Sequence, residues 1–183
     1  MKKSIYTLFS LFILISLSSC STALEEYSQE DGNFDIKEYF TGNVVARGVI
    51  QDYSSKVNRR FCVDIEGTWQ GSEGLLAEKF YFDDGEISYR NWQLSKQPDG
   101  SYQGTAEDVV GTAIGKHQGF AFQFQYQLSL VIDDTTYQVE MDDWMYQLND
   151  SHVLNKTVMR KLGVKVAEVT LFFDKSLPQK QCG

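Results

Sequence analysis

Apolar and polar residues alternate with a period of two along much of the chain, and residues 120–132 show this most clearly. Their even positions are all aromatic or aliphatic, whereas the odd positions from 121 to 129 are alanine, glutamine or serine. Successive side chains of a strand point to opposite faces, so this segment predicts a strand with one dry and one wet face. Similar patterns predict strands near 44–52, 60–67, 72–82, 86–95, 101–110, 118–132, 135–147, 151–160 and 164–174.

Turn signals recur at strand-length spacing, and the whole chain contains only two prolines. Short turns between many strands are typical of an antiparallel up-and-down meander. Closing the meander removes its exposed edges, so we expect an all-β, lipocalin-like barrel of about eight to ten strands. A short helix is expected within 33–40. The turn signals are Asp83-Asp84-Gly85, Pro98-Asp99-Gly100, Asp133-Asp134 and Asn149-Asp150.

The N-terminus has the pattern of a secretory signal: two lysines followed by an uncharged apolar run, Ile5–Leu17, too short to span a bilayer comfortably. The next residues, Leu17-Ser18-Ser19-Cys20, resemble the lipobox of bacterial lipoproteins. That resemblance implies cleavage before Cys20, diacylglycerol on its sulfur and fatty acylation, such as palmitate, on the new amine. The alternative is an ordinary signal with an incidental cysteine. Ser21 resembles an outer-membrane address, facing the periplasm.

These features divide the chain into a signal peptide at 1–19, a polar lipidated tether at 20–33 and a barrel domain at 34–183. The formal net charge is −8, and loss of Lys2 and Lys3 with the signal makes the mature chain more acidic still. An acidic protein repels nucleic acid and anionic lipid heads, so we expect neither as a partner. The expected membrane contact is the lipid anchor.

Two cysteines, Cys62 and Cys182, remain besides Cys20. In an oxidising periplasm they are candidates for a disulfide, which a closed barrel would favour by bringing early and late strands together. The alternative is a pair of free, buried thiols.

Four charged residues share strand faces with apolar neighbours: Glu78, Arg90, Asp108 and Asp143. Buried charges are costly unless paired, so we expect Arg90 to pair with Glu78 or Asp143, with Asp108 nearby. Two interpretations stay open, namely a salt-bridge network that fixes strand register and a polar end of an apolar pocket. A β-bulge at 142–143 would shift the phase and turn Asp142 inward instead.

The aromatic face of the 118–132 segment predicts a second part of the same interior. Phe122, Phe124 and Tyr126 lie on that face, and Trp92 shares the inner face of its own strand. Their commonest role is to pack the barrel core. The more informative alternative is a ligand cavity between them, so these residues and the four charges are the candidate binding residues.

The sequence offers little for catalysis. His117 and His152 have no spacing that suggests a metal site, and neither a nucleophile elbow nor a phosphate-binding glycine loop is present. Adjacent acids on a strand, as at 107–108 and 142–143, point to opposite faces and cannot act as a neighbouring dyad. We therefore expect no enzymatic activity, no cofactor and no metal.

Several segments resemble an uncharacterised family of Gram-negative lipoproteins, described as a domain of unknown function. The resemblance covers nearly the whole mature chain and implies no established activity. Gly67-Thr68-Trp69 also resembles the G-x-W element of lipocalins, although here it closes the second strand instead of opening the first. The family segments are 40–42, 60–69, 80–85, 102–111, 142–146 and Asn155.

Together these patterns predict a lipid-anchored periplasmic barrel that binds an apolar or amphipathic small molecule, with a lipid as one option. A structural or interaction lipoprotein with a filled barrel is the first alternative, and an enzyme acting on envelope lipids through its buried acids is the second. A cavity inside the barrel would favour the ligand-binding function over a filled, structural barrel.

Overall fold

The computed structural model describes residues 22–178 and 181–183. The signal segment and Cys20 lie outside these residues, so cleavage and lipidation stay predictions. Within the described residues, no helix is both long and apolar enough to cross a membrane.

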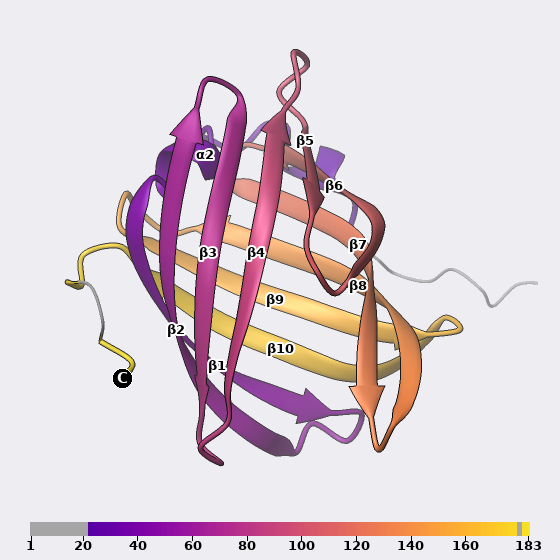
Figure 1. The fold of residues 1–183 in the computed structure, drawn as a ribbon. Coiled ribbons are helices and arrows are strands. Elements are labelled where there is room, and N and C mark those ends of the chain that lie inside the picture. The colour runs from indigo at the N-terminus through magenta and orange to yellow at the C-terminus, as the bar shows by residue number, and fades with distance from the viewer. Residues whose placement is uncertain (1–21, 179–180) are drawn as a thin grey trace, which may run out of the picture.

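Ten antiparallel strands of the described chain form one closed barrel (Figure 1). Each strand pairs with its neighbours in sequence, and β1 closes the barrel by pairing with β10. The predicted lipocalin-like, up-and-down barrel is therefore confirmed. The strands are β1 (Gly42–Asp52), β2 (Val57–Gln70), β3 (Glu73–Phe82), β4 (Ile87–Lys96), β5 (Tyr102–Thr105), β6 (Val109–Gln118), β7 (Ala121–Ile132), β8 (Thr135–Gln147), β9 (His152–Lys161) and β10 (Val164–Asp174).

The single strand predicted at 101–110 is wrong, because the chain turns at 106–108 and starts β6 there. The Val109 amide donates to the Ala106 carbonyl across this turn at 3.2 Å. Gly111 then takes a positive φ of 76°, and the β6–β7 register shifts between Val110 and Ile114. The alternation is interrupted at this bulge, and for that reason the pattern did not mark residues 111–117 as strand.

One end of the barrel is closed by the short helix α2 (Ile36–Tyr39), which lies at the top in Figure 1. Asp35 caps it by accepting from the amides of Lys37 at 2.9 Å and Glu38 at 3.4 Å. Tyr102 donates to Asp35 at 2.6 Å, and Lys96 forms an ion pair with it, so the cap also fixes the helix to the barrel wall. The apolar residues around the helix are almost fully buried: Phe34, Ile36, Tyr39 and Phe40.

Gly67, the glycine of the G-x-W element, makes this closure possible. A Cβ atom there would come within 1.6 Å of the Phe40 carbonyl oxygen, so only glycine lets the chain after α2 pass so close to β2. The G-x-W element, which resembles that of lipocalins, therefore lies at the closed end of the barrel.

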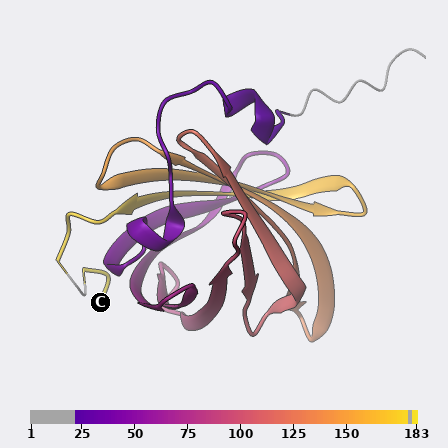
Figure 2. The same cartoon turned by 90° about the horizontal axis from the view of Figure 1, so that it is seen from above.

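The segment before α2 lies against the outer wall instead of forming a free tether. Its 3-10 turn, η2 (Leu24–Tyr27), packs Leu24 against Ala121 and Trp144, and Tyr27 contacts the Phe120 ring with 5.4 Å between centroids. Figure 2, seen from above, shows this segment leading from η2 to α2. Residues 22–33 of the predicted 20–33 tether are described, and part of them packs against the barrel. The Phe120 side chain, which alternation put on the inner face, contacts Tyr27 instead, because this segment covers the start of β7 from outside.

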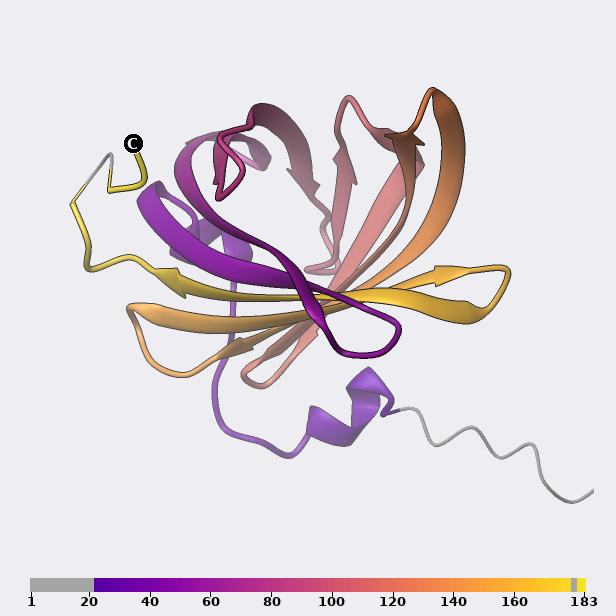
Figure 3. The same ribbon diagram turned by 90° about the horizontal axis from the view of Figure 1, so that it is seen from below.

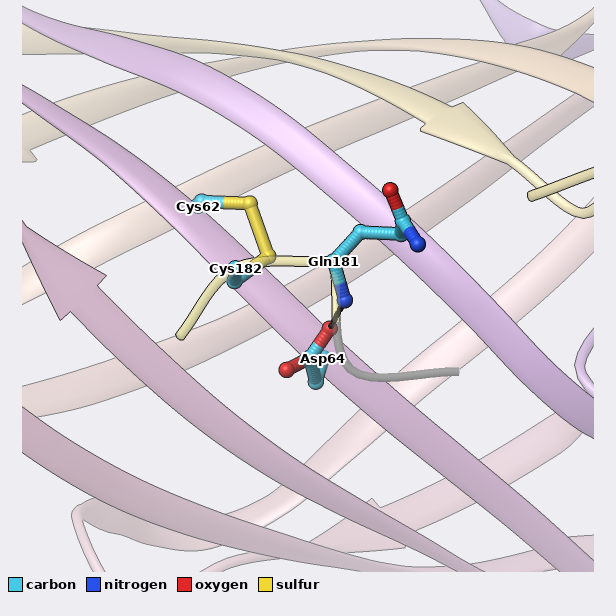
Figure 4. The surroundings of a disulfide bond; sticks show 4 residues. All are labelled: Cys62, Asp64, Gln181 and Cys182. Atoms are coloured by element: carbon cyan, nitrogen blue, oxygen red, sulfur yellow. Dashed lines mark hydrogen bonds between the residues drawn. A yellow bond between two sulfur atoms is a disulfide. The ribbon is translucent and has the colours of Figure 1, made fainter. Parts of the chain in front are cut away.

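The C-terminal tail is held by a disulfide between Cys62 on β2 and Cys182, the pairing that the sequence suggested (Figure 4). The two Cα atoms lie 5.4 Å apart and 120 residues apart in sequence. The Gln181 amide also donates to the Asp64 side chain at 3.2 Å. The tail thus lies along the outer face of β2, on the opposite side of the strand from the interior.

Candidate ligand-binding cavity

The barrel encloses a cavity of about 300 Å³, at the lower end of the range typical of small-molecule sites. Most of its wall is aromatic or aliphatic, contributed by the inward faces of the strands. Inward positions alternate as the sequence predicted: Leu76, Glu78, Phe80 and Phe82 on β3, and Met141, Asp143 and Met145 on β8. The β7–β8 register has no shift, so the alternative bulge at 142–143 does not form.

The two ends of the cavity differ in exposure. Near α2, Ile36 and Phe40 are each only 3% exposed. At the other end the lining residues Phe82 and Leu130 are partly exposed, and we call this end the mouth. Figure 3 looks onto it, where the β1–β2 and β3–β4 hairpins lie.

Exposed apolar side chains also occur on the hairpins of the mouth, among them Val131, Leu162 and Val164. These side chains add apolar surface around the mouth.

Aromatic rings form one side of the cavity. Trp92 packs against Phe124 with 5.0 Å between ring centroids and meets Tyr126 edge to face at 5.2 Å. Phe122 lies deeper and is fully buried, with its ring against Phe34 and Tyr102. The sequence placed these rings correctly inside, and the structure adds that Trp92, Phe124 and Tyr126 border open space.

Arg90 pairs with Asp108, not with Glu78 or Asp143 as the strand phase predicted. Its Nε lies 3.1 Å from each Asp108 oxygen, and its Nη2 lies 2.5 Å from Oδ2. Asp108 sits in the 106–108 turn, from which its carboxylate reaches Arg90 on β4, and it does not line the cavity. The prediction failed because it assumed a continuous strand through position 108.

Asp143 is held by polar neighbours on β7 and β9. The Asn155 amide donates to its Oδ1, and the Tyr126 hydroxyl lies 3.5 Å from Oδ2. Thr157 in turn donates to Asn155 at 3.2 Å. Burial raises the pKa of the Asp143 carboxyl to about 6, although these hydrogen bonds oppose the rise.

Glu78 lies directly opposite Arg90 in the β3–β4 register, yet among the described residues it makes neither a hydrogen bond nor an ion pair. Its partly accessible surface borders the cavity. Burial raises the pKa of its carboxyl to about 7, with the positive charge of Arg90 opposing the rise. Glu78 therefore presents an unoccupied polar group to the cavity.

The sequence missed three polar residues of this site. Arg59 lies in the wall near the mouth, stacked over the Phe82 ring at 3.7 Å, and Asn155 and Thr157 contact Asp143 from β9. Alternation along the predicted strand 151–160 would have put both β9 residues on the inner face beside Val153. Neither residue carries a charge, so neither stands out from its apolar neighbours as Asp143 does on β8.

The fold and the cavity define a class: an all-β, lipocalin-like barrel whose interior is closed at one end and hollow. Residues 14–175 match the model of a family described as "Protein of unknown function (DUF3833)", and the chain belongs to that family. No curated protein matches the chain significantly.

Among solved structures, the chain is similar to an S-type phycobiliprotein lyase, CPES, from Guillardia theta. The superposition has a TM-score of 0.58 at 8% sequence identity and covers 87% of this chain and all of the lyase chain. At this identity the likeness shows the shared barrel fold alone.

Proposed function

We propose that this protein binds an apolar or amphipathic small molecule, such as a lipid, inside the barrel. The observation that carries the proposal is a hollow, apolar interior closed by α2, with carboxyl groups at one place in its wall. A barrel with a purely structural role has no need of this volume, because packed cores rarely leave voids larger than a water molecule. The Guillardia theta lyase has the same fold, but its name supplies no ligand for this chain.

We also propose that the protein is a lipoprotein attached through Cys20 to the outer membrane and facing the periplasm. The support is the sequence pattern of a signal run that ends in a lipobox-like segment. The two or three acyl chains that such a site carries hold a soluble domain firmly, since each buried methylene contributes about 0.8 kcal/mol.

Native mass spectrometry of full-length protein extracted from membranes tests both proposals. We expect the intact mass to show loss of residues 1–19 and gain of acyl groups, and we expect a fraction of the protein to retain a small molecule. A Cys20→Ser variant should remain as the uncut, unacylated precursor. Acylation of that variant would contradict the anchor.

A further inference from the structure

The charged groups of the cavity wall differ in their pairing. Four charged side chains line it: Arg59, Glu78, Arg90 and Asp143. The arginines already have partners outside the cavity, because Arg59 contacts Asp84 at 2.8 Å and Glu86 at 2.9 Å, and Arg90 holds Asp108 in a bidentate pair.

The two carboxyls of the wall have no such cationic partner. Within the described residues, neither Glu78 nor Asp143 lies within ion-pair distance of a lysine, arginine or histidine. Asp143 accepts from Asn155, while Glu78 faces the cavity without a donor. The Tyr126 hydroxyl lies 3.5 Å from Asp143 and interacts electrostatically with Glu78 as well, so we name these three groups the acidic corner of the cavity.

This arrangement of charges determines which polar head group a bound ligand can have. An anionic head at the acidic corner would enter an apolar space beside two carboxyls. Arg90 already holds Asp108, and the unpaired Nε of Arg59 lies near the mouth, away from the corner, so the head would lose its hydration without a compensating partner close by. A head that donates hydrogen bonds would instead satisfy Glu78, and a positive charge would add an attractive interaction in a poorly screened environment.

We propose that the cavity selects amphiphiles whose head donates hydrogen bonds, with an amine preferred, and rejects amphiphiles with a carboxylate head. This inference rests on the proposed binding function and names the ligand class. The apolar chain would lie along Trp92 and Phe124, and the head would meet the acidic corner.

Ligands of one chain length separate the effect of the head group on binding from the effect of the apolar chain. Decylamine, decanol and decanoate are titrated against the neutral dye N-phenylnaphthylamine bound to mature protein in nanodiscs, with empty discs as background. At pH 7.5 we expect decylamine to displace the dye at a concentration at least about tenfold lower than decanoate, with decanol between them; tenfold corresponds to about 1.4 kcal/mol.

A Glu78→Gln variant tests the role of the corner. Glutamine keeps the size of the side chain and removes the charge, so the preference for decylamine over decanoate should shrink several-fold. Glu140→Gln, on the exposed outer face of β8, is the matched control and should keep the wild-type preference. A melting curve of each variant shows that it is folded.

The outcomes distinguish this inference from the binding function. If decanoate displaces the dye as well as decylamine does, the head-group preference is wrong while the cavity still binds apolar chains. If Glu78→Gln keeps the full preference, the acidic corner is not its source. If neither the dye nor any of the three ligands binds, the proposed function itself fails.

Discussion

At the scale of single residues, the predictions for binding and for stability depend most on Glu78. The strand phase alone placed it inside, since Leu76 and Phe80 flank it on the same face of β3. The same reasoning placed Arg90 and Asp143 correctly. The partner of Arg90 depends on where the turn after β5 falls, and the pattern of apolar residues does not show that position. For this reason the pairing of Arg90 with Asp108 was not predicted.

Glu78 gives the fold a pH dependence of defined sign. Its pKa rises from 4.5 to about 7 on folding, so between these values the folded protein binds more protons at this site than the unfolded chain does. Its contribution to stability is therefore most favourable at low pH and falls as the pH rises toward and past 7.

Glu78→Gln should remove that dependence. At pH 8 we expect the variant to be more stable than the wild type by roughly 2 kcal/mol, and near pH 4.5 we expect little difference. Urea unfolding at both pH values measures this, with Glu140→Gln as the exposed control. A variant less stable than wild type at pH 8 would show that Glu78 has a stabilising partner when ionised.

At the scale of elements, seven of the nine predicted strand segments each overlap one strand of the barrel, and an eighth, 118–132, covers β7 and shares only Gln118 with β6, because the period of two survives along them. The pattern failed at the 106–108 turn and at the bulge after Gly111, where strand pairing is irregular. It also failed at the outer face of β7, which the N-terminal segment covers. There Ala121 is fully buried because η2 covers it, and a contact between distant segments leaves no mark in local alternation.

The link between β2 and the C-terminal tail is the element-scale contact with the largest expected energetic effect. Because the disulfide closes a loop with a sequence separation of 120, a chain-entropy estimate gives up to roughly 5 kcal/mol, and measured effects are commonly about 2–4 kcal/mol. We expect a Cys62→Ser, Cys182→Ser double variant to lose stability in that range.

Denaturant unfolding checks this loss, and wild-type protein treated with a reductant should lose a similar amount. Recovery of both cysteines as free thiols in non-reducing peptide mapping of untreated protein would contradict the disulfide.

At the scale of the whole molecule, the two ends of the barrel differ, because α2 closes one end and the mouth is at the other. Leu24 packs beside the first residue of β7, at the end that α2 closes. Leu24 lies four positions after Cys20, a span of at most about 14 Å when extended. An anchor on Cys20 would hold the closed end near its membrane and leave the mouth directed away from it.

The central claim is that the interior of the barrel is a binding site, and strand alternation supplies the variants that test it. Leu130 points into the cavity near the mouth, whereas its neighbour Val131 is 71% exposed on the outside. Leu130→Trp should fill the entrance, and Val131→Trp adds the same residue one position along without touching the cavity.

The decisive measurement is a titration of N-phenylnaphthylamine against the mature wild-type protein and these two variants in nanodiscs, read by direct excitation of the dye. We predict saturable binding to wild type and Val131→Trp, and binding at least about tenfold weaker to Leu130→Trp, a loss of about 1.4 kcal/mol. Equal binding by all three proteins, or no saturable binding by the wild type, would contradict a ligand site inside the barrel.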